Sequence, residues 1–192
     1  MKKYIKDYVI FFLITVLVFT IDQWTKRWAQ NTLSTKKVIY SPPPCDEKGP
    51  VKKRERHFPS KEIIVIKGFW TFHYVENCAG AFGMFANHSE EFRRPFFTIF
   101  SIIALIFIIW MTTKLHQMSW LFKIGLPMIL GGAIGNMFDR FTKTYVIDFI
   151  HWYVNGFHWP TFNIADVGIT VGVGLIILDT FLHKENRRKE KR

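Results

Sequence analysis

The chain has few cysteines and few acidic residues for its length. Only Cys45 and Cys78 occur among 192 residues, so the fold is not a disulfide scaffold. Asp and Glu number 15 against 26 Lys and Arg, which gives a net charge of +11. No HExxH, P-loop or dinucleotide-binding sequence is present, which argues against zinc metalloproteases and nucleotide-binding enzymes. Disorder is excluded as well, because 49% of the residues are hydrophobic.

The hydrophobic residues are concentrated in four long stretches. Mean hydropathy is +0.09 although 21% of the residues are charged, so polar and apolar residues are segregated along the chain. A membrane helix needs about 20 mostly apolar residues. The sequence therefore predicts an all-α membrane protein, a single domain over 1–192, with four transmembrane helices at about 8–28, 96–113, 118–138 and 164–182.

Basic residues beside these stretches predict their orientation. They precede the first stretch, flank the short link between the second and the third, and dominate the tail 183–192, with six basic residues against two acidic ones. Lys and Arg near the ends of membrane helices favour the cytoplasmic side. Both termini are therefore predicted to be cytoplasmic, and 29–95 and 139–163 to lie outside. Because the membrane explains the positive charge, no nucleic-acid partner is predicted.

Two outer segments differ in composition. Residues 41–60 hold five prolines and a dense run of charge, which predicts a flexible loop. The basic residues of this loop either touch anionic lipid headgroups or belong to a tolerated surface insertion. Residues 61–85 are β-branched and aromatic before they turn through Asn and Gly, which predicts a small extracytoplasmic β element.

Two outer carboxylates are the strongest candidates for chemistry. Asp148 lies in the apolar segment YVIDFIHWY, and Asp166 follows Asn163 by three residues at the start of the fourth stretch. Asp166 also fits a helix-capping role, and Asp148 also fits an interfacial carboxylate bonded to backbone amides. Two carboxylates that meet in a poorly hydrated site share one proton, so that one activates water and the other polarises a carbonyl. The helix N-terminus favours Asp166 as the ionised partner at the outset.

Other ionisable residues lie at predicted helix ends. Asp22 and Lys26 are four residues apart on one helix face, which favours a structural ion pair. Asp139 and Arg140 follow the third stretch and form either a polar helix terminus or, through the arginine, a clamp for carboxylates or a backbone carbonyl.

A metal site is the weaker alternative for the outer residues. Asp148 and His151, with His158 later, supply ligand types, but their spacing fits no standard metal-binding pattern. Histidine and tryptophan at such positions are more typical of an interfacial aromatic belt. No metal or other cofactor is predicted.

Five segments taken in chain order resemble the prolipoprotein signal peptidase family, signal peptidase II. They are DQWTK at 22–26, YVENCAGAFGMF at 74–85, GGAIGNMFDR at 131–140, VIDF at 146–149 and FNIAD at 162–166. The resemblance implies a four-helix aspartic peptidase without a metal, in the bacterial cytoplasmic (inner) membrane. It further implies cleavage of diacylglyceryl-modified prolipoproteins just before the modified Cys, at the outer leaflet, and inhibition by globomycin.

Matching the motifs assigns roles to individual residues. The resemblance implies Asp148 and Asp166 as the catalytic pair. It implies supporting or substrate-binding roles for Asn136, Arg140, Asn163, Asn77, Asp139, Asp22 and Lys26. The partners implied are the prolipoprotein and membrane lipids, and nothing requires more than a monomer. The sequence departs from the family pattern where Ala79 and Gly80 stand in exchanged order, a change that bears on the β element over the substrate.

Two other functions remain open from the sequence. A non-enzymatic membrane binding or assembly protein would use the outer β element to dock a partner, and it would cleave no lipoprotein precursor. A small carrier would use Asp22, Lys26 and Asp148 as a proton path, and it would need an oligomer because four helices enclose little space.

Overall fold

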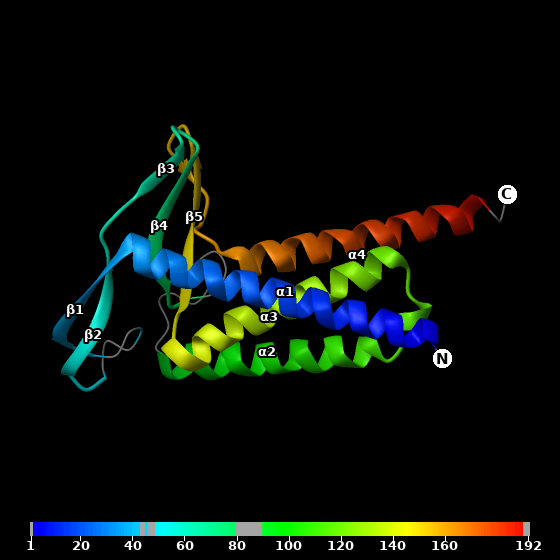
Figure 1. Cartoon of the computed structure of the whole chain (residues 1–192), viewed down its shortest axis with the longest axis horizontal. Coiled ribbons are helices and arrows are strands. Elements are labelled where there is room, and N and C mark those ends of the chain that lie inside the picture. The colour runs from blue at the N-terminus through cyan, green and yellow to red at the C-terminus, as the bar shows by residue number, and fades with distance from the viewer. Residues whose placement is uncertain (1, 43–44, 46–48, 80–89, 190–192) are drawn as a thin grey trace. The chain divides into compact units, whose positions relative to one another are not determined.

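The computed structural model describes residues 2–42, 45, 49–79 and 90–189. Four long helices and a β element are present as predicted, but with two sheets the fold is mixed and not all-α. Local hydropathy identifies the helices, whereas the strands depend on partners that are distant in the chain. In order the elements are α1 (Lys2–Leu33), β1 (Ser34–Ser41), β2 (Lys52–Pro59), β3 (Ile63–Ile66), β4 (Trp70–Asn77), α2 (Glu90–Thr112), η2 (Leu115–Gln117), α3 (Trp120–Lys143), β5 (Val146–Val154), β6 (Phe157–His158) and α4 (Ile164–Lys189) (Figure 1).

The chain divides into two compact units. The helical unit comprises Met1–Ile21, Ile102–Gly135 and Ile164–Arg192. The outer unit, named for its predicted location, comprises Asp22–Ser101 and Asn136–Asn163. The division cuts through all the long helices except α4, so the outer unit holds one end of α1, α2 and α3 together with the strands.

Three helices in the described part of the chain are long and apolar enough to cross a membrane. They cover Glu91–Thr112, Trp120–Lys143 and Ile164–Leu182. Most apolar side chains of α2 are exposed, among them Phe100 at 64% and Ile106 at 62%, although Ile108 is buried. Such exposure of large apolar side chains along a whole helix suits a lipid environment. The chain is therefore a membrane protein with four long helices and small antiparallel sheets.

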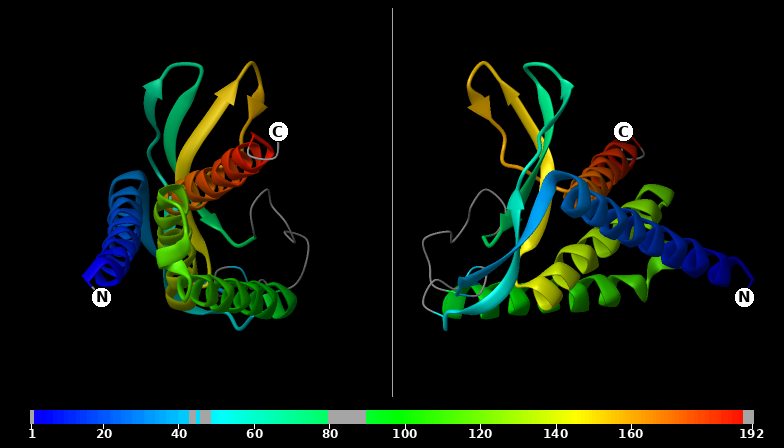
Figure 2. Two further views of the ribbon diagram at one scale, coloured as in Figure 1. Left: turned by 90° about the vertical axis from the view of Figure 1, so that its right-hand side faces the viewer. Right: turned by 60° about the vertical axis from the view of Figure 1, so that its left-hand side comes forward.

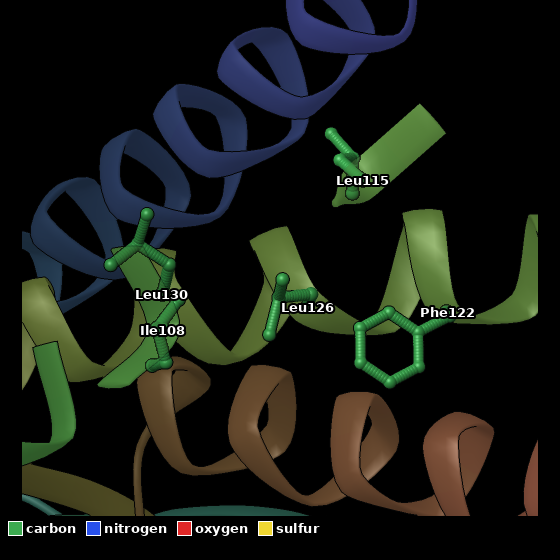
Figure 3. Close-up of a cluster of buried hydrophobic side chains, with 5 residues drawn as sticks. All are labelled: Ile108, Leu115, Phe122, Leu126 and Leu130. Carbon is green, nitrogen blue, oxygen red and sulfur yellow. The ribbon is translucent and has the colours of Figure 1, made fainter. Parts of the chain in front are cut away.

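Small residues allow the helices of the helical unit to approach closely. A Cβ atom added to Gly125 of α3 would lie 2.6 Å from the carbonyl oxygen of Gly172 in α4. At Gly132 an added Cβ would overlap the carbonyl oxygen of Ala165 at the start of α4. Close backbone contact of this kind is the usual way in which membrane helices pack. Apolar side chains complete the core of this unit, namely Ile108, Leu115, Phe122, Leu126 and Leu130 (Figure 3).

A four-stranded antiparallel sheet forms the centre of the outer unit, with strand order β3-β4-β5-β6. The β3–β4 and β5–β6 hairpins lie at the same end of this sheet (Figure 2). Strands β3 and β4 lie within the predicted β region 61–85, whose residues 80–85 fall outside the described residues. Strand β5 was not predicted, and its pairing with β4 sets Val75 opposite Asp148.

The prediction of a loop over 41–60 is wrong for residues 52–59. These residues form β2, which pairs in register with β1 from Ser34↔Pro59 to Ser41↔Lys52. The strand was not predicted because its charged sequence, KKRERHFP, lacks the alternation of apolar and polar residues that is typical of strands. Contacts between the two strands stabilise this charged hairpin, and Lys36 of β1 forms an ion pair with Glu55 of β2.

The two cysteines form a disulfide bond that the sequence analysis did not predict. Cys45, in the turn region between β1 and β2, is bonded to Cys78, which directly follows β4. The bond joins the two sheets of the outer unit across 33 residues of sequence. Disulfides persist in oxidising compartments, so the bond agrees with the predicted outer location of this unit.

Breaking this disulfide is expected to destabilise the outer unit. Cys45→Ser, or reduction of the wild type, should lower the free energy of unfolding by about 2–4 kcal/mol, because the open loop gains conformational entropy when unfolded. The measurement is thermal unfolding of the full chain in detergent with and without reductant. The control is Cys45→Ser itself, which should not respond to reductant; an equal response of both proteins would contradict the prediction.

Three histidines lie together on the sheet. His151 Nε2 is 3.1 Å from His158 Nδ1, and the rings of His73 and His151 are 4.8 Å apart. Burial lowers the pKa of His73, and the His151 ring lowers it further. Burial likewise lowers the pKa of His151, with a further contribution from His158. The folded sheet therefore favours neutral imidazoles.

Acidification is expected to weaken this sheet. Since the pKa values of His73 and His151 fall below the ordinary value of 6.5, the unfolded chain binds more protons than the folded one in the interval below 6.5. Stability should therefore be complete above that interval and should decline as pH falls through the lowered values. Melting temperature against pH measures this decline, and a double variant, His73→Gln with His151→Gln, should show less of it. A wild type that is more stable in mild acid would contradict the prediction.

Candidate active site

Asp148 lies in β5 with its side chain turned into the outer unit. The first five residues of β5 are buried, and Asp148 is only 2% exposed. Asn163 Nδ2 donates a hydrogen bond to Oδ1 at 2.7 Å, and Asn77 Nδ2 donates one to Oδ2 at 2.7 Å. Both carboxylate oxygens thus accept an amide N–H, an arrangement that stabilises negative charge in a buried place.

Asn77 is itself held in orientation. It is the last residue of β4, and its Oδ1 accepts a hydrogen bond from the backbone N–H of Ala79 at 2.9 Å. The next residue is Cys78, which the disulfide ties to Cys45. The Asn77 side chain, which donates to Asp148, is therefore held in place by strand β4, by the hydrogen bond from Ala79 and by the adjacent disulfide.

Asn163 connects Asp148 to α3. Its Nδ2 also donates a hydrogen bond to Asn136 Oδ1 at 3.1 Å, so both amide protons are used. Asn136 Oδ1 accepts a second hydrogen bond, from Lys26 Nζ at 3.0 Å. These amides form a continuous hydrogen-bonded path from the α1 lysine to Asp148.

Lys26 stands between two carboxylates. Its Nζ is 2.8 Å from Asp22 Oδ2 and 3.0 Å from Asp139 Oδ2, and all three side chains are 0% exposed. Lys143 supplies a second cation, 2.8 Å from Asp139 Oδ1. The two ammonium groups therefore balance the two carboxylates, and buried charges are tolerated only when they are paired in this way. Asp139 Oδ2 also accepts the backbone N–H of Ile147 at 3.2 Å, next to Asp148 in β5.

Arg140 lies at the edge of this network. Its Nη1 donates to the backbone oxygen of Asn136 at 3.4 Å, and its guanidinium carbon lies 5.0 Å from the centre of the Phe97 ring. Both side chains line a cavity of the outer unit, together with Met137 and the Cys45–Cys78 disulfide. Arg93 lines the same cavity, which therefore combines positive charge with a largely apolar lining.

Asp166 lies in the first turn of α4, three residues after Asn163, and is half-buried. The preceding residue, Ala165, is the one whose backbone contacts Gly132 of α3. Its pairing with Asp148 stays a prediction.

Seven of the nine predicted site residues belong to the network around Asp148, and Arg140 joins it through a backbone contact. The sequence analysis missed two members, Lys143 and Gln23. Gln23 Nε2 donates to Asp22 Oδ2 at 3.0 Å. The spacing of four residues between Asp139 and Lys143 was a usable signal, whereas nothing in the sequence indicated Gln23. Among the described residues, no group of three or more His, Cys, Asp or Glu is arranged to hold a metal ion.

Comparison with known proteins connects this geometry to a family. The family model described as signal peptidase (SPase) II matches residues 14–182, which include every residue of the site. The chain belongs to the signal peptidase II family. Membership makes it a lipoprotein signal peptidase, an aspartic peptidase of the membrane.

Individual relatives agree with the family. The chain is 38% identical over 172 residues to the lipoprotein signal peptidase of Anaeromyxobacter sp. (strain Fw109-5), covering 86% of this chain and 82% of the relative. It is 32% identical over 180 residues to that of Alteromonas mediterranea, covering 94% and 85%. A solved structure, described as a bacterial membrane enzyme determined by the in meso method, matches with a TM-score of 0.69 and 27% identity, covering 92% of this chain and 90% of that one.

Proposed function

We propose that the chain hydrolyses diacylglyceryl-modified prolipoproteins at the peptide bond before the modified Cys, with Asp148 and Asp166 as the catalytic pair. The observation that carries the proposal is the environment of Asp148, a buried carboxylate with one amide donor on each oxygen. Asp166, in the FNIAD segment, is the second carboxylate of the proposed pair. Asn163, three residues before it in the same segment, donates a hydrogen bond to Asp148.

The reaction uses one ionised and one protonated carboxylate. The ionised group takes a proton from water while the water oxygen attacks the scissile carbonyl carbon, and the protonated group gives its proton to the carbonyl oxygen. The tetrahedral intermediate then collapses: the C–N bond breaks, the leaving nitrogen takes up the proton held by the first carboxyl group, and one hydroxyl of the intermediate returns a proton to the second carboxylate as the C=O bond reforms. Asn77 and Asn163 hold the Asp148 carboxylate in place throughout, and the two carboxyl groups exchange acid and base roles within each turnover, which ends in the starting protonation state.

Arg140 and the buried charges serve the site without taking part in proton transfer. Arg140, facing the cavity, hydrogen-bonds the substrate backbone or carbonyl groups. The Asp22–Lys26–Asp139 cluster fixes Asn136, and through it Asn163. No metal takes part in this mechanism.

The proposed membrane arrangement has α1 as the fourth span. Its charged residues Asp22 and Lys26 are fully buried and paired, which is the condition under which charges are tolerated at membrane depth. The ends of α1 and α3 and the start of α2, which belong to the outer unit, then face the outer leaflet of the bacterial inner membrane, and both termini are cytoplasmic. The acyl chains of the substrate stay in the bilayer while its peptide bond reaches the carboxylates. A monomer suffices, and a globomycin-type inhibitor occupies the same site.

A gel-shift assay tests the function. The full chain in detergent is mixed with a diacylglyceryl-modified prolipoprotein, and with the same precursor lacking the lipid as the matched control. We expect cleavage of the modified precursor alone, unaffected by EDTA. No cleavage by a folded chain would refute the proposal, and loss of cleavage in EDTA would refute the metal-free mechanism.

A further inference from the structure

The β1–β2 hairpin, residues 34–59, is the most basic part of the outer unit. The segment holds seven basic residues and three acidic ones. Within the described part of the chain, two of the basic side chains have acidic partners, Arg56 with Glu76 and Lys36 with Glu55. No carboxylate of the described residues forms an ion pair with the others that the structure describes, Lys37, Lys52, Lys53 and Arg54. This hairpin therefore carries positive charge that the described structure does not neutralise.

Exposed apolar and aromatic side chains accompany this charge. Tyr40 is 75% exposed and stands directly opposite Lys53, so the two share one face of the hairpin. Val38 on the same face is 56% exposed, and Val51, just before β2, is 64% exposed. Lysine beside tyrosine and aliphatic side chains is a combination typical of the membrane–water interface.

Both ends of the hairpin are attached to membrane helices. At one end Leu33 of α1 leads directly into Ser34, and the chain returns there, because the backbone N–H of Ser60 donates to the carbonyl oxygen of Leu33 at 3.0 Å (Figure 1). At the other end Arg93 in the first turn of α2 donates to the carbonyl oxygen of Cys45 at 3.0 Å. Strand β1 alone covers about 26 Å, from eight residues at about 3.3 Å each.

This attachment determines where the hairpin lies relative to the bilayer. In the proposed membrane arrangement, the end of α1 and the start of α2 reach the same outer face. A strand pair that runs from one helix end to the other must then follow the membrane surface at the level of the headgroups. Its unneutralised lysines lie where the phosphates of phospholipids are.

We infer that the β1–β2 hairpin binds the headgroups of anionic phospholipids in the outer leaflet. Lys53 shares the face of Tyr40, whereas Lys37 and Lys52 lie on the opposite face of the hairpin. Because the hairpin lies within the headgroup layer, lysines of both faces pair with headgroup phosphates, while Tyr40 and Val51 lie at the boundary between headgroups and acyl chains. The inference rests on the membrane arrangement under the proposed function. Each basic residue near an anionic membrane contributes about 1 kcal/mol, which is about fivefold in affinity.

The test measures lipid binding by the full chain. Short-chain phosphatidylglycerol, or phosphatidylcholine as the zwitterionic control, is titrated into the protein in a zwitterionic detergent and bound lipid is counted by native mass spectrometry. We expect tighter binding of phosphatidylglycerol, weakened by salt. The triple variant Lys37→Gln, Lys52→Gln and Lys53→Gln should lose about a hundredfold in affinity.

Single variants provide a matched control. Lys53→Gln and Lys67→Gln remove the same charge from exposed positions of the outer unit, and only Lys53 belongs to the hairpin. The inference requires Lys53→Gln to weaken binding about fivefold and Lys67→Gln to leave it unchanged. Equal effects of the two variants, or unchanged binding by the triple variant, would overturn it.

Amide hydrogen exchange locates the contact independently of enzymatic turnover. In nanodiscs, residues 34–41 and 52–59 should exchange more slowly with phosphatidylglycerol than with phosphatidylcholine. Slower exchange confined to the link around Lys114 and Lys123 would overturn the inference. Because neither lipid measurement requires cleavage, a chain that binds lipid through the hairpin but cleaves no precursor would refute the proposed function while supporting the inference.

Discussion

Asp148→Asn is expected to reduce cleavage of the modified prolipoprotein by about 10⁴-fold, the upper end of what a positioned acid–base group contributes. The substitution keeps the size of the side chain but removes the group that gains and loses a proton. Asp166→Asn should have a similar effect, because each carboxylate is both acid and base within one cycle. The measurement is kcat/KM from initial rates of the gel-shift assay.

Folding has to be separated from catalysis in this experiment. An amide at position 148 faces the two amide donors Asn77 and Asn163, so the melting temperature of Asp148→Asn is measured alongside its activity. Asp179→Asn serves as the matched control for Asp166→Asn. Both residues lie in α4, but Asp179 accepts a hydrogen bond from Ser119 of the helical unit. Asp179→Asn should retain wild-type activity. Full turnover by either Asp148→Asn or Asp166→Asn would exclude the two-carboxylate mechanism.

Lys26→Met is expected to destabilise the protein by about 3–5 kcal/mol, because it removes the cation from between two fully buried carboxylates. Asp22 then loses the Lys26 ammonium, and Asp139 loses it while retaining Lys143. Asn136 Oδ1 also loses its hydrogen bond from Lys26, so cleavage should decline together with stability. Thermal and denaturant unfolding of the full chain in detergent measure the effect.

Two variants separate charge from packing at this position. Lys36→Met breaks the exposed ion pair with Glu55 and should cost no more than about 1 kcal/mol. Combining Lys26→Met with Asp22→Asn and Asp139→Asn leaves no uncompensated buried charge, so stability should recover substantially. A Lys26→Met protein as stable as the wild type would show that the cluster does not hold the site together.

Features that depend on residues close together in the chain could be predicted from the sequence. Four apolar stretches predicted the positions of the long helices, because membrane helices are defined by local hydropathy. The pair Asp22–Lys26 followed from a spacing of four residues. Motif order indicated the family and singled out Asp148, and the structure gives that carboxylate a buried, doubly hydrogen-bonded environment.

Which of these residues come into contact depends on the folding of distant segments onto one another. Asn77 and Asp148 are 71 residues apart, and Lys26 and Asn136 are 110 apart, so no local pattern indicates either contact. The pairing of β4 with β5 places Asn77 beside Asp148. The polar strand β2 was missed because its charged sequence lacks the apolar alternation typical of strands. The Cys45–Cys78 bond was missed because the two cysteines are 33 residues apart and only the fold brings them together.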